Sequence, residues 1–143
     1  MQTERSAILP GDLDAVRDAL LAPELLSAWL GPWTDHGDGH ARVVTDDGVT
    51  RRVSDHHLDA DGHVRWTWSP LDDPECRSEV VVHLEDLDAG TQVVIRETLV
   101  GGHADDRLGD HVEASIHGSS SDRWTRCLLV LGAVLDQHRL VAV

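Results

Sequence analysis

The chain has 143 residues and a formal net charge of −14, from 26 acidic and 12 basic residues. An electrostatic field of that sign repels a phosphate backbone or an anionic membrane surface, so neither is expected as a partner. The length suits one domain with a core of its own, and we expect a single domain over residues 1–143.

Neither export nor membrane insertion is indicated. The first ten residues lack the apolar stretch of a secretory signal, and no run approaches the roughly 18 apolar residues of a membrane span. The two cysteines, Cys76 and Cys127, do not form a Cys-x-x-Cys pair. We therefore expect a cytoplasmic protein with reduced thiols.

The N-terminal forty residues are predicted to form a short strand, two short helices and a connector. Residues 3–9 alternate weakly, as in a strand. Asp12 is a candidate N-cap for a helix over residues 13–21, and a proline favours the start of a second helix over residues 23–30. The segment 33–40, WTDHGDGH, is interpreted as an exposed connector.

A meander of strands is predicted next, because the apolar period changes to two. Short links rich in turn formers separate five runs, which implies antiparallel neighbours. The runs are 41–45, 49–58, 63–69, 77–85 and 92–100. Together with the first strand they predict a curved, six-stranded antiparallel sheet.

The C-terminal segment 121–140 has the pattern of a helix. Large apolar side chains recur once per turn, at Trp124, Leu128, Leu131 and Leu135. A sheet with one apolar face must be covered, and this helix is the long apolar element left to cover it. We therefore predict an α+β fold in which the long helix packs over the concave face of the sheet.

Four segments of the chain resemble a known superfamily. They are PELLSAWLGPW at 23–33, VRWTWSP at 64–70, SEVVVHLEDLDAGTQVVI at 78–95 and the tryptophan-led helix at 124–135. Their order is similar to that of the START-like superfamily, also called SRPBCC or helix-grip, and of its branch related to the C-terminal domain of the heat-shock-protein-90 ATPase activator. The resemblance implies a cavity under the long helix. Members include lipid and hormone binders, polyketide cyclases and co-chaperone domains, so the fold does not determine the function.

The chain departs from the family pattern at two positions. A glycine that often precedes the helix tryptophan is Arg123, and a histidine often found late in the sixth strand is Glu97. Glu97 occupies an inward position among apolar neighbours, where a carboxylate needs a partner. Arg52, His56 and His57 are the candidates. Glu97 is then a ligand anchor or a general acid or base; the alternative is a strand-end residue that reaches solvent.

The expected interior suggests a ligand-binding role. We interpret the chain as a binding domain for an apolar or amphipathic small molecule that needs no cofactor, and nothing in the sequence demonstrates catalysis. The same tryptophans could simply fill a core. The candidate ligand-binding residues are Trp66, Trp68, Val82, Ile95, Glu97, Trp124, Leu128 and Leu131.

Two other functions remain open. A polyketide-cyclase-like enzyme would use Glu97, His56 or His83 to move protons. A co-chaperone-like domain, or a homodimer, would use exposed apolar residues of the last helix, such as Leu129 and Val130.

Metal and nucleophile motifs are not evident. The ten histidines lack a ligand framework, there is no G-x-S-x-G sequence, and Cys127 lies among leucines as an inert buried thiol would. We expect no metal site. The connector 101–121, dense in Gly, His, Asp and Ser, is expected to be a lid, a crossover or a disordered segment.

Overall fold

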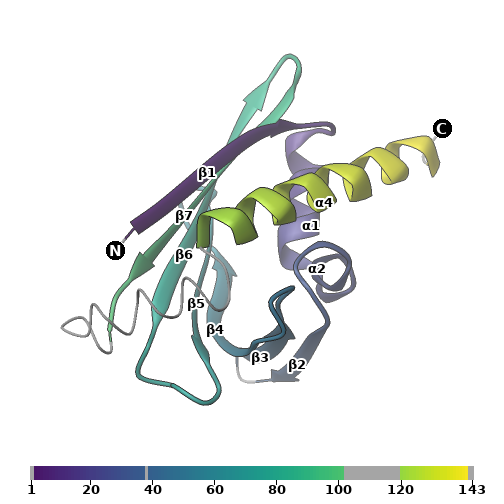
Figure 1. Cartoon of the computed structure of the whole chain (residues 1–143). Helices are drawn as coiled ribbons and strands as arrows, with labels where there is room; N and C mark the ends of the chain where they lie inside the picture. The colour runs from purple at the N-terminus through teal and green to yellow at the C-terminus, as the bar shows by residue number, and fades with distance from the viewer. Residues whose placement is uncertain (1, 38, 102–119, 142–143) are drawn as a thin grey trace.

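The computed structural model describes residues 2–37, 39–101 and 120–141, which form an α+β fold of seven strands and three helices (Figure 1). Most of the 101–121 connector lies outside the described residues. The strands are β1 (Gln2–Leu9), β2 (Trp33–Gly37), β3 (His40–Val44), β4 (Thr50–Leu58), β5 (Val64–Pro70), β6 (Ser78–Leu87) and β7 (Gly90–Leu99). The helices are α1 (Leu13–Leu21), α2 (Pro23–Trp29) and α4 (Ser120–Val141).

The strands form one open antiparallel sheet with the order β1-β7-β6-β5-β4-β3-β2. Strands β2 to β7 follow the chain order, because short links leave each strand beside the previous one. The N-terminal strand β1 pairs with β7 at the far edge. The predicted meander is confirmed.

Strand β2 corrects the prediction for residues 33–40. The segment is not a connector: Trp33 pairs with Val43, and Gly37 pairs with His40. Four of the five β2 residues are exposed, so the strand lacks the apolar alternation by which strands are recognised. The sheet therefore has seven strands, where the sequence predicted six.

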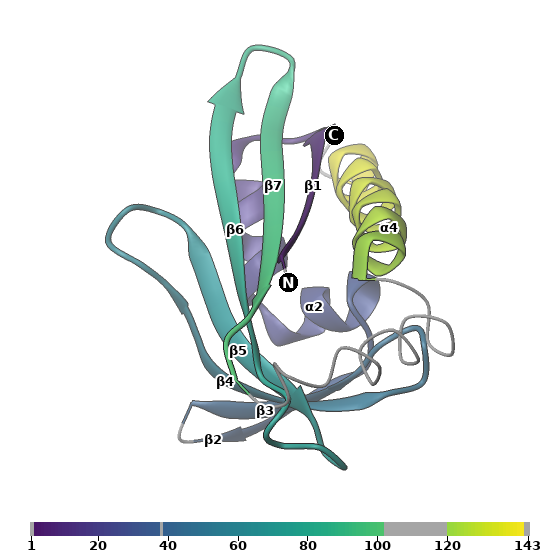
Figure 2. The ribbon, with the colours of Figure 1, turned by 60° about the vertical axis from the view of Figure 1, so that its left-hand side comes forward.

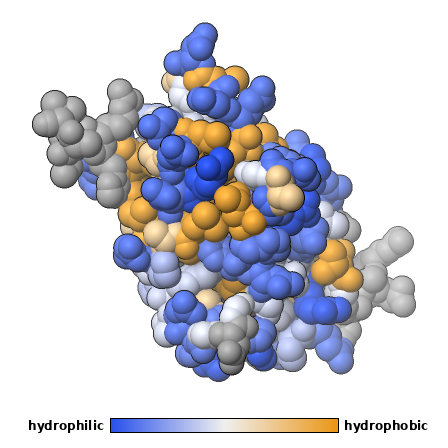
Figure 3. All heavy atoms as spheres, turned by 180° about the vertical axis from the view of Figure 1, so that it is seen from behind, coloured by the Kyte–Doolittle hydropathy of each residue, from blue (hydrophilic) through white to orange (hydrophobic). Residues whose placement is uncertain are grey.

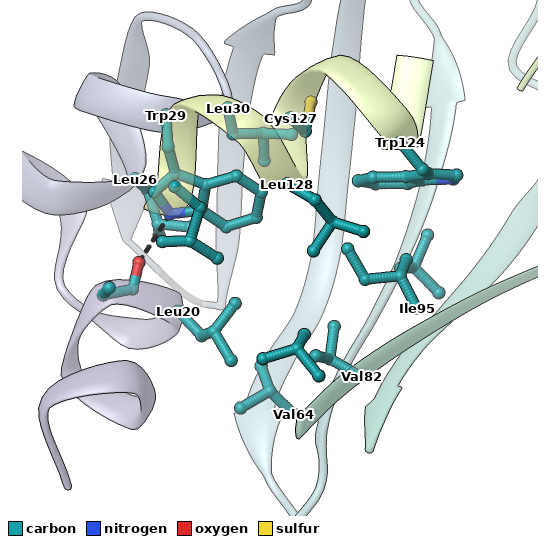
Figure 4. Packing of buried hydrophobic residues seen from close by; sticks show 14 of the residues in the cluster. Leu20, Leu26, Trp29, Leu30, Val64, Val82, Ile95, Trp124, Cys127 and Leu128 are labelled. Atoms are coloured by element: carbon teal, nitrogen blue, oxygen red, sulfur yellow. Dashed lines mark hydrogen bonds between the residues drawn. The ribbon is translucent and has the colours of Figure 1, made fainter. Parts of the chain in front are cut away.

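The helix pair begins where the sequence predicts. The Asp12 side chain accepts a hydrogen bond of 2.8 Å from the backbone N–H of Ala15, as an N-cap does. Pro23 starts α2. The Trp29 indole donates to the carbonyl of Ala19 at 2.7 Å and so ties α2 to α1 (Figure 4).

Helix α4 lies on the concave side of the bent sheet, beside β1 and α2 (Figures 1 and 2). Its predicted apolar stripe is buried, whereas Leu129 on the outer side is 72% exposed. Figure 4 shows Trp124 and Leu128 pointing from this helix toward Ile95 and Val82 of the sheet. The predicted position of the long helix is confirmed.

None of the described helices is long and apolar enough to span a membrane.

The surface carries apolar residues in several places. On the face opposite to that of Figure 1, hydrophobic areas are interrupted by hydrophilic residues (Figure 3). On α4, Leu129 and Val130 are exposed and Val134 is half-buried.

Candidate functional site

Three indoles form the centre of the interior between the sheet and α4. Trp66 and Trp68 are alternate residues of β5, so both face the same side of the sheet. Trp124 reaches them from α4: its ring stacks on Trp68 at a centroid distance of 5.6 Å and an angle of 14°. Trp66 meets both rings edge-on, at 5.8 and 6.3 Å. No more than 1% of each side chain is exposed.

The other predicted site residues surround these indoles. Val82 and Ile95 are cross-strand partners on β6 and β7, and Leu128 and Leu131 follow Trp124 on α4. All four are buried in the same cluster, in which Figure 4 labels Val82, Ile95 and Leu128. The structure thus brings the predicted residues together, and their role in binding stays a prediction.

Glu97 lies inside this cluster and is 7% exposed. The indole N–H of Trp68 donates to Oε2 at 2.9 Å, and that of Trp124 donates to Oε1 at 3.0 Å. The Arg123 guanidinium is 3.4 Å from Oε1. The carboxylate therefore joins β5, β7 and α4 through charge-assisted contacts.

The prediction that Arg52, His56 or His57 pairs with Glu97 is wrong. Arg52 and His57 are exposed, and His56 is bonded elsewhere. The residue that pairs with Glu97 is Arg123, which is the other position at which the sequence differs from the START-like pattern that it resembles. Sequence patterns within a single strand cannot show this contact, because it joins residues of two different elements.

Glu97 belongs to a buried charged cluster, which we define as Asp47, Arg51, Glu97 and Arg123. Asp47 is 3.4 Å from both guanidinium groups. The guanidinium carbons of Arg51 and Arg123 lie 5.1 and 5.9 Å from the Trp68 ring centroid, within cation–π range. Two positive and two negative charges therefore balance around one indole.

Burial and neighbouring charges change the ionisation of the cluster. Burial lowers the pKa of Arg51, and the Arg123 charge lowers it further, against the opposing effect of Asp47 and Glu97. Burial raises the pKa of Asp47, but hydrogen bonds from Thr45 and Val49, with the two guanidinium charges, outweigh it and leave that pKa lowered.

Sequence reasoning missed Asp47 and Arg51. Asp47 lies in the turn before β4, where its carboxylate also accepts hydrogen bonds from the Thr45 hydroxyl and the Val49 amide. Arg51 precedes the buried Val53 by two residues, so it occupies an inward phase of β4. The alternation of inward and outward residues along β4 was the signal that could have identified Arg51 as buried.

His56 faces the interior because β4 has a bulge. The register shifts between Ser54 and His57, and Asp55 adopts a positive φ of 59°. The His56 ring then lies 5.8 Å from the Trp66 ring, and its Nε2 is 2.8 Å from the Leu20 carbonyl. A carbonyl only accepts, so Nε2 carries the proton. Burial lowers the pKa of His56 and favours this neutral form.

His83 does not face the interior. It lies between two inward-phase residues of β6, on the outer side of the sheet, and its Nδ1 is 3.3 Å from Nε2 of His63. Of the three groups considered for proton transfer, Glu97 and His56 lie inside and His83 lies outside.

Two buried donors of the interior have no partner among the residues that the structure describes. Nε1 of Trp66 is buried and makes no hydrogen bond in the described part of the chain, although Trp29, Trp68 and Trp124 each donate to an oxygen. Nε of Arg123 is also buried without a partner there. Buried polar groups are normally paired, so these two donors need an explanation.

A group on the β4–β5 loop has the residue types of a metal site. The candidate ligand atoms of Asp59, Asp61 and His63 lie within 4.8 Å of one another. However, the Asp59 carboxylate already accepts from the amides of Asp61 and His63 and from Arg65. The Arg65 hydrogen bond holds the pKa of Asp59 at about 2, below its ordinary 3.8. These contacts stabilise a turn.

No family model and no curated protein matches the sequence. Solved structures do match. Protein MLL2253 from Mesorhizobium loti is 19% identical with a TM-score of 0.72, over 96% of this chain and 98% of the other. DynU16, from the dynemicin biosynthetic locus, is 19% identical with a TM-score of 0.70, over 94% of this chain and 47% of the other. A conserved protein from Geobacillus kaustophilus is 12% identical with a TM-score of 0.70, over 96% of each chain. At these identities the likeness shows the fold.

Proposed function

We propose that the chain is a START-like (SRPBCC, helix-grip) domain that binds an apolar or amphipathic small molecule between the sheet and α4. The strand and helix order and the solved structures of similar fold support this assignment. The interior between the sheet and α4 is mostly apolar and holds a few polar groups, a composition that is typical of small-molecule sites.

The observation that carries the proposal is that Nε1 of Trp66 is buried and has no hydrogen-bond partner among the residues that the structure describes. A buried donor left without an acceptor costs about 1–3 kcal/mol, because it loses the hydrogen bond that water would accept. A bound molecule with an acceptor would recover this loss. The neighbouring indoles of Trp68 and Trp124 are held in place by Glu97, so they offer a preorganised aromatic wall.

The test is a thermal-shift screen of apolar and amphipathic compounds, followed by native mass spectrometry of the hits. Two variants of α4 form a matched pair: Leu128 is 5% exposed and faces the interior, and Leu129 is 72% exposed and faces outward. We expect Leu128→Ala to change the affinity for a hit several-fold and Leu129→Ala to leave it unchanged. A broad screen without a stabilising compound would contradict the proposal.

A cyclase-like enzyme is the second candidate, supported by the inward-facing His56 and by the similarity to DynU16. Both Glu97 oxygens already accept hydrogen bonds from protein donors, so His56 is the better candidate for moving a proton. For any compound that is turned over, His56→Gln is expected to abolish turnover while binding persists. A variant that retains full turnover would exclude His56 from this role.

A further inference from the structure

The ligand class can be inferred from the free donor of Trp66, among the residues that the structure describes, and from the charges around the neighbouring Trp68. We infer that the ligand is an uncharged, largely apolar molecule that presents an acceptor oxygen, such as that of a ketone or an ether, to Nε1 of Trp66. This inference rests on the proposed binding function and adds the chemistry of the ligand to it.

The need for an acceptor follows from the hydrogen-bond inventory. An indole N–H only donates, so Nε1 of Trp66 can be satisfied only by an acceptor. The oxygens of Glu97, which bond the two indoles that pack on Trp66, already accept from Trp68, Trp124 and Arg123. Nε of Arg123, the other donor of this interior without a partner in the described residues, also requires an acceptor. Both of these interior groups are donors.

The absence of charge on the ligand follows from the balance of the charged cluster. Arg51 pairs with Asp47, and Arg123 pairs with both Asp47 and Glu97, each at 3.4 Å. An anion would therefore add an uncompensated charge to a buried region. The overall charge of −14 also repels anions. A cation would have to displace a guanidinium from its carboxylate.

The test compares three probes of one ring system: 2-acetylnaphthalene with a neutral acceptor, 2-ethylnaphthalene without an acceptor, and 2-naphthoate with a charge. Dissociation constants are measured by isothermal titration calorimetry. We expect the acetyl compound to bind roughly three- to tenfold more tightly than the ethyl compound, as a typical net hydrogen bond gives. The naphthoate should bind most weakly.

Two variants separate the hydrogen bond from the charge. Trp66→Phe keeps an aromatic ring and removes the N–H, so the ratio of acetyl to ethyl affinity should fall to about one. The ratio is read within the same variant, so a general loss of affinity does not affect it. Glu97→Gln leaves the charged cluster with a net positive charge, so 2-naphthoate should gain affinity relative to the acetyl compound. Leu129→Ala is the control on the outer face of α4.

The outcomes distinguish this inference from the proposed function. Equal binding of the acetyl and ethyl compounds, tightest binding of the naphthoate, or an acetyl preference retained in Trp66→Phe would each overturn the inference while a binding function stands. Failure of all three probes, together with a screen that yields no ligand, would overturn both.

Discussion

Two groups of charged residues can be compared directly: the buried charged cluster, and Asp59 with its donors at the β4–β5 turn. The charged cluster lies inside, where Glu97 is 7% exposed and its side chain joins the sheet to α4. The turn of Asp59 lies at the outer end of the β4–β5 hairpin, and its carboxylate bonds within its own loop and to Arg65. Both carboxylates accept several donors, so the number of hydrogen bonds does not distinguish them. The two carboxylates differ in what their removal would leave behind. Removal of Glu97 would leave its donors unpaired in the buried interior, whereas the donors of Asp59 lie in a turn that water can reach.

The largest effect is expected from Glu97→Ala. The change leaves Arg123 and two indole N–H groups without their acceptor in the interior, and breaking a buried ion pair in this way costs about 3–5 kcal/mol. Urea denaturation gives the free energy of unfolding. Glu79→Ala on the neighbouring strand is the control, because that side chain is 46% exposed, and a loss as small as that of the control would show that the cluster does not hold α4.

An intermediate effect is expected from the ionisation of His56. Because the pKa of His56 is lowered in the folded protein, the neutral form is favoured, and stability is lost as the pH falls below the ordinary value of 6.5. Glutamine at this position keeps a donor for the Leu20 carbonyl and does not titrate. The unfolding free energy of His56→Gln should therefore decrease less than that of the native chain between pH 7.5 and 5. Parallel pH curves would contradict the assignment.

The smallest effect is expected from Asp59→Asn. The lowered pKa of Asp59, about 2, means that its contribution is present above its ordinary pKa and is lost as the pH falls from 3.8 toward 2. The variant should differ little from the native chain at pH 7, because solvent screens this site. Its melting temperature should depend less on pH between 4 and 2. An effect at pH 7 comparable to that of Glu97→Ala would invalidate the comparison of the two groups.

Much of the interior could be predicted from the sequence, because the regular period of a strand or helix determines the side on which each side chain lies. Alternate residues of a strand face one side, which places Trp66 and Trp68 inward, and the helical spacing from Trp124 places Leu128 and Leu131 on the same face of α4. The caps and turns mark where the elements begin and end. The periodicity of apolar residues, together with the caps and turns, was enough to predict that these residues lie close together in the interior.

The remaining features depend on departures from those periods. β2 is mostly exposed and gives no apolar signal. The bulge at Asp55 changes the face on which His56 lies, and one irregular residue is not visible in a pattern of period two. The partner of Glu97 lies 26 positions away, on a helix, so only the packing of complete elements brings Arg123 to it.

The contact between Glu97 and Arg123 joins the two positions at which the sequence differs from the START-like pattern that it resembles, so the two differences act as a single coupled change. A glycine at position 123 would take one positive charge from the interior and leave the carboxylate undercompensated; a histidine at position 97 would place an imidazole against a guanidinium. Either exchange by itself leaves one charge without its partner, whereas the two together remove one positive and one negative charge and keep the interior balanced. Relatives of this chain should therefore show covariation at these positions, with Glu–Arg and His–Gly as the common combinations and the mixed pairs rare.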